Sequence, residues 1–201
     1  MDPSKPILFY DIASGPPVTT YSPNPWKTRY ARNFKGVHYT TERIDHPQVT
    51  AVRKKLDCPP VRWHRDGTPF YTLPIIHYPS TGKMVGDSFE IARYLDAEYP
   101  NGPRLIPPST TALHRAFNIH VDKISPTSKA EFDDLTLRGD VRTKQLAEFK
   151  EALGVLATFY VDEEAPFLED MIVGAWLQFL KASLAEWKES FEVLNQYAEV
   201  K

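Results

Sequence analysis

The sequence has only one cysteine, Cys58, in 201 residues. A single cysteine cannot form an internal disulfide, a dithiol redox pair or a thiolate-rich metal site, and its isolation agrees with a reducing compartment. The six histidines show no spacing typical of a metal-binding helix, and we expect them at surface or loop positions. No glycine-rich phosphate-binding loop is present. The sequence therefore predicts no metal site.

Excess charge and long apolar runs are also lacking. Lys and Arg number 24 against 26 for Asp and Glu, which gives a net charge of -2. Such a balance creates no broad field to hold nucleic acid or an anionic membrane. The apolar runs fall short of the ~20 residues of a membrane span, and the first residues lack the apolar core of a signal peptide. We expect a soluble, cytoplasmic protein.

What is present divides the chain into two parts. Hydrophobic residues make up 42% of the sequence, enough for a substantial core. Most of the 18 prolines precede about residue 110, whereas the remainder is rich in Leu, Ala, Glu and Lys at helical spacing. This change in composition predicts one domain at residues 1–102 and an all-helical domain at residues 103–201.

Local patterns predict alternating strands and helices in the first domain. Short apolar or β-branched runs indicate strands, and prolines in a first turn followed by Gly36 indicate a helix. A Pro-rich and charged stretch at 45–71 is predicted to be irregular. The predicted elements are strand 7–10, helix 23–34, strand 38–44, strand 72–78, strand 83–85 and helix 87–99.

The second half contains two apolar stripes at helical spacing. The first runs along residues 142–160 and the second starts at Ile172 and includes Trp176 and Phe179. Because each stripe needs a partner to bury it, we expect packed helices. The aromatic residues of the second stripe are predicted to lie in the core.

The first candidate site residue is Ser22, which immediately precedes the predicted helix 23–34. At this position unpaired backbone N–H groups and the positive end of the helix dipole favour an anion such as a thiolate. The alternative is that Ser22 serves only as the N-cap of the helix, a role worth about 1 kcal/mol. The residues alone favour the capping role.

The second candidate is the Leu73-Pro74 pair before a predicted strand. A cis peptide bond here would present the backbone N–H and C=O of Leu73 to a ligand. Most bonds before proline are trans, so the residues alone favour an ordinary trans proline.

The third candidate is Asp87-Ser88 at the start of a predicted helix. Asp87 and Glu90 have the spacing of a capping box, which is a sufficient structural reason for them. A carboxylate and a hydroxyl beside unpaired helix N–H groups can also hold the ammonium and carboxylate of an amino acid together.

In this order and spacing, the three stretches resemble the glutathione site of glutathione transferases. The segments SPNPWKTR (22–29), DGTPFYTLP (66–74) and GDSFEIARYL (86–95) are most similar to the fungal branch of the FuA type, related to bacterial β-etherases. The resemblance is close over the first 107 residues and resumes at 139–156 and 175–178. It implies an α/β thioredoxin-like N-terminal domain followed by an all-α C-terminal domain.

The resemblance also implies roles for the candidate residues. Ser22 would activate the glutathione thiol, and Leu73 beside a cis Pro74 would contact the cysteinyl part. Asp87 and Ser88 would bind the γ-glutamyl group. A hydroxyl and a helix N-terminus favour a thiolate over a thiol of ordinary pKa about 8.5.

We therefore predict a detoxifying glutathione S-transferase, with glutathione as co-substrate, that conjugates hydrophobic or aromatic electrophiles or cleaves ethers. The resemblance implies a homodimer. The sequence is shorter than the family pattern after Asn118 and near Pro166, which predicts a shortened helical domain. Alternatives are a non-catalytic or specialised protein that binds a small hydrophobic metabolite, and an interaction protein that keeps only the fold.

Overall fold

A four-stranded sheet forms the centre of the N-terminal part. The computed structural model describes residues 6–15, 20–124 and 168–183. In the sheet, ordered β2-β1-β5-β6, β1 is parallel to β2, and β5 is antiparallel to both β1 and β6. The strands are β1 (Ile7–Ile12), β2 (Tyr39–Ile44), β5 (Ile75–Tyr78) and β6 (Lys83–Gly86).

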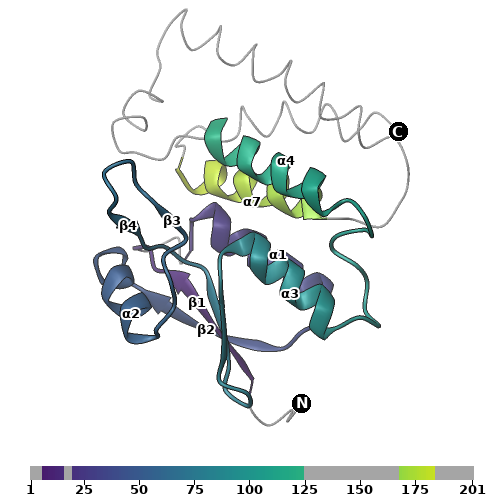
Figure 1. Cartoon of the computed structure of the whole chain (residues 1–201), viewed down its shortest axis with the longest axis horizontal. Helices are drawn as coiled ribbons and strands as arrows, with labels where there is room; N and C mark the ends of the chain where they lie inside the picture. Colours follow the sequence, from purple (N-terminus) through teal and green to yellow (C-terminus); the bar gives the residue numbers. More distant parts are fainter. Residues whose placement is uncertain (1–5, 16–19, 125–167, 184–201) are drawn as a thin grey trace, which may run out of the picture.

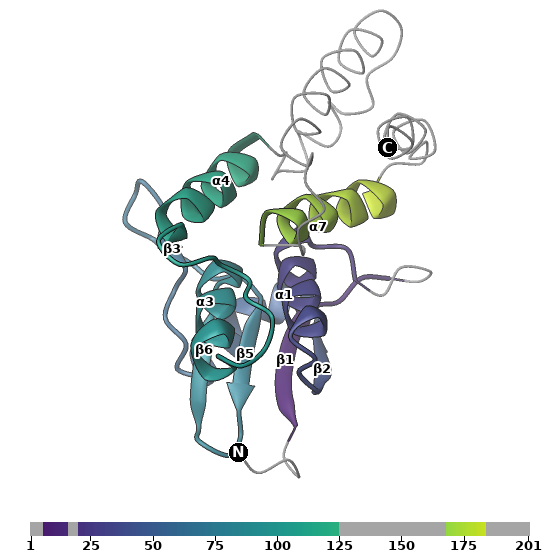
Figure 2. The same cartoon turned by 90° about the vertical axis from the view of Figure 1, so that its right-hand side faces the viewer.

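Alternate residues of β1 enter two cores on opposite faces of this sheet. Ile7 and Phe9 join a cluster with helices α1 (Pro23–Phe34) and α3 (Ser88–Glu98). Tyr10 and Ile12 join a second cluster with α2 (Val49–Lys55). This division follows from the two-residue period of a strand, which sends successive side chains to opposite faces. The result is a thioredoxin-like α/β unit with helices on both faces (Figures 1 and 2).

Two further helices lie across one end of this unit. They are α4 (Thr111–Ile124) and α7 (Leu168–Ser183), which lie beside each other, and α7 packs along α1 (Figures 1 and 2). Met171 and Ile172 of α7 enter the same core as α1 and α3. The backbone N–H of Leu168 donates to the carbonyl of Leu105 at 3.0 Å, so the start of α7 is tied to the α/β unit.

The predicted elements of the first domain are present, but the predicted strand 72–78 begins only at Ile75. Helix 23–34 has the predicted bounds, and Gly36 follows it with a φ of 66°, a conformation that glycine adopts without strain. The stretch 45–71 is more regular than predicted, because it contains the 3₁₀ turn His46–Gln48, α2 and a short hairpin of β3 (Arg62–Trp63) and β4 (Pro69–Phe70). The predicted helix 142–160 lies outside the described residues.

The expected surface position of the histidines is wrong for His114. This residue is 3% exposed because it lies on the face of α4 that also buries Asn118, one turn later. Among the described residues, no group of three or more His, Cys, Asp or Glu side chains could hold a metal ion. Within the same part of the chain, no helix is long and apolar enough to cross a membrane.

Candidate functional site

The register of the sheet brings the candidate residues to one edge. Tyr10 of β1 pairs with Ile75 at the start of β5, and Ile75 pairs with Gly86 at the end of β6. Leu73-Pro74 precedes Ile75, and Asp87 follows Gly86. The loop to Ser22 leaves the same end of β1. The N–H of Asp87 donates directly to the carbonyl of Pro74 at 3.3 Å, which joins two of the three stretches.

Ser22 occupies the N-cap position of α1, but its hydroxyl makes no capping hydrogen bond. Its backbone carbonyl accepts the N–H of Trp26 at 3.3 Å. Pro23 and Pro25 have no N–H, so Asn24 supplies the only unbonded amide of this first turn. The expected group of several N–H donors is therefore reduced to one, and the Ser22 hydroxyl is not engaged in capping.

A buried carboxylate anchors the loop that carries Ser22. Asp11, fully buried at the end of β1, accepts hydrogen bonds from Thr20 Oγ1 at 2.8 Å and Arg29 Nη2 at 2.6 Å. The indole N–H of Trp26 donates to the Thr20 carbonyl at 3.4 Å. Thr20, two residues before Ser22, is thus bonded to both β1 and α1. These bonds restrict the position of Ser22 at the start of α1.

The peptide bond between Leu73 and Pro74 is cis, as the family resemblance implies and against the preference of proline bonds in general. Leu73 is fully buried in the cluster beside α2, and Tyr21, next to Ser22, packs against that cluster. The second candidate stretch therefore lies close to the first.

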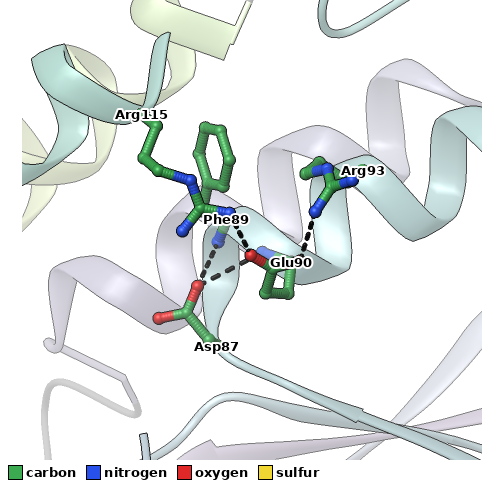
Figure 3. Close-up of polar contacts among 5 residues, drawn as sticks. All are labelled: Asp87, Phe89, Glu90, Arg93 and Arg115. Carbon is green, nitrogen blue, oxygen red and sulfur yellow. Dashed lines mark hydrogen bonds and ion pairs between the residues drawn. The ribbon is translucent and has the colours of Figure 1, made fainter. Parts of the chain in front are cut away.

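Asp87 is the N-cap of α3 and uses its side chain for that role. Its Oδ1 accepts the N–H groups of Phe89 at 2.9 Å and Glu90 at 3.2 Å (Figure 3). Burial raises the pKa of the Asp87 carboxyl, while these two N–H groups and Lys27 act in the opposite direction. Ser88 begins the helix and is 4% exposed.

The expected capping box is only half formed. The Asp87 N–H donates to Pro74, and the Glu90 carboxylate turns instead to Arg93 at 2.9 Å and to Arg115 of α4 (Figure 3). The Arg115 guanidinium also lies over the Phe89 ring, 4.6 Å from its centroid. Glu90 therefore links α3 to α4 rather than completing the cap.

Lys27 is a site neighbour that the sequence did not single out. Its ammonium, 1% exposed, contacts Asn118 Oδ1 at 2.8 Å and Asp122 Oδ1 at 2.6 Å, both on α4. Burial lowers the pKa of Lys27, and Asp122 opposes that effect. The only sequence signal would be its place on the inward face of α1, four residues before Ala31, which is also buried.

A groove of about 690 Å³ adjoins Asp87. It lies between the loop after α2, β6, α3 and α4, and Arg53 and Cys58 are among the residues that line it. Burial raises the pKa of the Cys58 thiol, so this cysteine is a poor nucleophile in its present surroundings. At 5% exposure, Cys58 is part of the packed cluster beside α2.

Family and curated-protein comparisons agree with this geometry. Residues 21–98 match the model of the glutathione S-transferase N-terminal domain. The glutathione S-transferase-like protein ustS of Aspergillus flavus is 37% identical over 105 residues, which cover 49% of this chain and 37% of that protein. The match thus spans little more than a third of the curated relative.

Solved structures extend the similarity over nearly the whole chain. A glutathione S-transferase of Ceriporiopsis subvermispora, crystallised with glutathione, is 31% identical with a TM-score of 0.76, covering 97% of this chain and 98% of that one. Glutathione transferase GSTFuA2 of Phanerochaete chrysosporium is 28% identical with a TM-score of 0.72, covering 97% and 98%.

Proposed function

The chain belongs to the glutathione transferase superfamily, and we propose that it binds glutathione at the edge formed by Ser22, Leu73 and Asp87 and joins the glutathione sulfur to hydrophobic electrophiles. One observation carries the proposal: a cap-position serine whose hydroxyl makes no cap bond shares one sheet edge with the Leu73-Pro74 pair and a buried carboxylate. The two fungal transferases reported above support it through their overall similarity.

The residues present fit the parts of a γ-glutamyl tripeptide. Asp87 gives Oδ1 to the helix, and Oδ2 lies outside those two bonds, so we assign Oδ2 to the ammonium of the γ-glutamyl group. Ser88 and the first turn of α3 suit its carboxylate. The backbone of Leu73 would pair with the cysteinyl residue. Asn24 Oδ1, buried and without a described donor, provides a further acceptor near Ser22.

In the proposed reaction, the hydroxyl of Ser22 donates a hydrogen bond to the glutathione sulfur. This bond stabilises the thiolate, and the thiol proton passes to solvent. The thiolate attacks an electrophilic carbon, forming a carbon–sulfur bond. In a displacement, the bond to a halide or to an ether oxygen breaks and the leaving group takes the electron pair. In an addition, the π bond at the attacked carbon breaks, its electron pair moves to the neighbouring atom, and that atom takes a proton from solvent.

Two aromatic pairs support a hydrophobic second substrate. Trp26 and Tyr30 of α1 lie with ring centroids 5.3 Å apart, and Trp176 and Phe179 of α7 make an edge contact at the same separation. Both tryptophans and Tyr30 are only partly buried. We propose that this aromatic surface near the start of α1 accepts the electrophile. The homodimer implied by the resemblance and the cytoplasmic location expected from the composition belong to the same proposal.

The test combines calorimetry with conjugation assays. Wild-type protein should bind glutathione and conjugate an aryl halide or an isothiocyanate. Ser22→Ala should lower kcat about a hundredfold, since it removes one donor to the developing anion. Ser80→Ala, an exposed serine in the turn at the far end of β5, is the matched control and should keep wild-type rates.

Each other outcome has a definite meaning. Binding without turnover in the wild type would favour the ligand-carrier alternative. No glutathione binding at millimolar concentration would sink the proposal and favour a protein that keeps only the fold.

A further inference from the structure

Arg53 is a buried arginine for which the proposed reaction has no direct use. It lies in the last turn of α2 and is 2% exposed, whereas the adjacent Lys54 and Lys55 are exposed. Burying a guanidinium is costly unless its donors are satisfied. The contacts that compensate this cost are therefore informative about the role of the residue.

The guanidinium of Arg53 joins three segments of backbone. Its Nε donates to the carbonyl of Pro59 at 2.8 Å, and its Nη1 donates to the carbonyl of Thr72. Its third nitrogen, Nη2, packs on Gly86 so closely that a Cβ at that position would overlap it; the same Cβ would lie 3.1 Å from Cζ of Arg53. The absence of a side chain at Gly86 is thus a requirement of this arrangement.

Two of these segments lead directly into the proposed glutathione contacts. Thr72 precedes Leu73 and Gly86 precedes Asp87. Arg53 and Asp87 also attract each other, since the Asp87 charge favours the protonated form of Arg53 and partly offsets the lowering of the Arg53 pKa by burial. One planar guanidinium therefore fixes the spacing between the backbone that would hold the cysteinyl residue and the carboxylate that would hold the γ-glutamyl ammonium.

We infer that Arg53 is a positioning residue for glutathione binding, acting through Thr72 and Gly86 without touching the ligand. This inference rests on the proposed function, because it assigns Arg53 to the same site. Ligand contacts depend on the positions of the binding groups to within a fraction of an ångström. If the backbone at Thr72 or Gly86 shifts, the proposed contacts to the cysteinyl and γ-glutamyl parts of glutathione therefore weaken.

The chain offers a matched control in Arg32. This arginine of α1 is also fully buried, but none of its three nitrogens has a hydrogen-bond partner in the described part of the chain. It lies between the rings of Phe9 and Tyr39, at 4.4 and 3.2 Å from their centroids, and burial lowers its pKa to about 9. Arg32 touches neither Thr72 nor Gly86, so its loss perturbs the core without loosening the proposed site.

The first experiment compares Arg53→Met and Arg53→Lys with Arg32→Met. Arg53→Met should raise the glutathione Kd and the KM for glutathione at least about tenfold, with kcat at saturating glutathione and the KM for the electrophile changed less than about twofold. Arg53→Lys should recover only part of the affinity, because an ammonium cannot bridge both carbonyls in the fork geometry. Arg32→Met should leave the glutathione Kd unchanged even where it lowers Tm.

The second experiment disturbs the contact between Arg53 and Gly86 by substituting Gly86. It also tests the inference if Arg53→Met does not fold. Gly86→Ala should also raise the glutathione Kd. The double variant with Arg53→Met should bind no worse than Arg53→Met alone, because the severe overlap of the added methyl group is with the arginine, and Cys58 Sγ, at 3.0 Å, has to move by only a few tenths of an ångström. Gly102→Ala is the control, since a Cβ there would have ordinary contacts, the nearest at 3.6 Å.

Three results would overturn the inference. They are a wild-type Kd in Arg53→Met, wild-type behaviour of Arg53→Lys, and additive effects of the Arg53 and Gly86 substitutions. A wild-type protein that binds no glutathione would overturn the proposed function as well. Wild-type binding together with unaffected variants would overturn the role of Arg53 alone.

Discussion

The helices α1 and α3 begin at the same edge of the sheet, yet they begin differently. Ser22 stands at the cap position of α1 with its hydroxyl unused for capping, whereas Asp87 caps α3 through two N–H groups. In α1, Pro23 and Pro25 remove the donors that a cap would satisfy. A helix start rich in proline therefore needs no side-chain cap, and its serine can serve chemistry instead of stability.

The comparison shows two ways of building one ligand site. At α3 the same carboxylate supports the helix and faces the proposed ligand, so structure and binding are coupled at Asp87. At α1 the two roles are separate in our proposal, because the neighbouring Asp11, Thr20 and Arg29 hold the loop while Ser22 carries the hydroxyl proposed to act on the thiol. Substitutions at Asp87 and Ser22 test this coupling and this separation.

The largest expected difference is between Asp87→Ala and Ser22→Ala. Asp87→Ala should lower the free energy of unfolding by about 1–2 kcal/mol through loss of the cap, and should also weaken glutathione binding. Ser22→Ala should change the free energy of unfolding by less than about 0.5 kcal/mol, because no cap bond is lost. Urea unfolding of both variants measures the contrast. Equal losses would show that the Ser22 hydroxyl caps α1 in solution.

A pH series should sharpen the coupling at Asp87. Burial raises its pKa in the folded protein above the ordinary value of about 3.9, so its protonated form is favoured by folding. This contribution is complete below the ordinary pKa and is lost as pH rises through the folded pKa. Wild-type stability should therefore fall relative to Asp87→Asn between acid and neutral pH, because asparagine keeps the cap without the charge.

Glutathione binding should show the opposite trend. The proposed contact to the γ-glutamyl ammonium needs an ionised Asp87, so wild-type affinity should rise over the same pH interval. In Asp87→Asn the affinity should lack this rise. Calorimetry and urea unfolding across the interval measure both slopes. Parallel slopes in the two proteins would remove Asp87 from the binding site.

The smallest effect is expected at Glu90. Because Glu90 pairs with Arg93 and Arg115 instead of closing the capping box, Glu90→Gln should lower the free energy of unfolding by no more than about 0.5 kcal/mol, and salt should reduce the difference. Glutathione affinity should stay at the wild-type value. A salt-independent loss of 1 kcal/mol or more, on the order of a full cap, would indicate that Glu90 supports the helix start.

The strands and the helix starts were predictable because their signals are local. Apolar runs defined β1 and β5, and Thr81-Gly82 marked the turn between β5 and β6, where Gly82 has a φ of 70°. The three candidate stretches were also found locally, since each combines a special residue with the start of an element. Their meeting at one edge follows from the order and direction of the strands.

Helices α2 and α4 gave no such signal. In α2 only Val49 and Arg53 are buried, so no apolar stripe marks it. In α4 the pattern is mixed: Phe117 and Val121 pack against the core, but Leu113 and Ile119 are exposed while His114 and Asn118 are buried. Tertiary packing decides these positions, and a single sequence does not carry that information.

The burial of Lys27 and Arg53 near the candidate site also depends on tertiary packing and was not predicted from the sequence. Lys27 and Arg53 read as surface charges, because long basic side chains are almost always solvated. Their burial depends on acceptors far along the chain, namely Asn118 and Asp122 for Lys27 and the Thr72 carbonyl for Arg53. A sequence pattern shows only neighbours within a few turns, so these partnerships required the folded structure.

The close contact of Arg53 with Gly86 also has an evolutionary consequence. A lineage that replaces glycine at position 86 while arginine remains at 53 meets a severe steric overlap, whereas one that first shortens position 53 meets only the milder contact with Cys58 Sγ at 3.0 Å. The order of the two substitutions therefore decides whether the change at position 86 is tolerated. This is a case of sign epistasis between positions 33 residues apart in sequence (86 minus 53). Related sequences should show the two positions changing together.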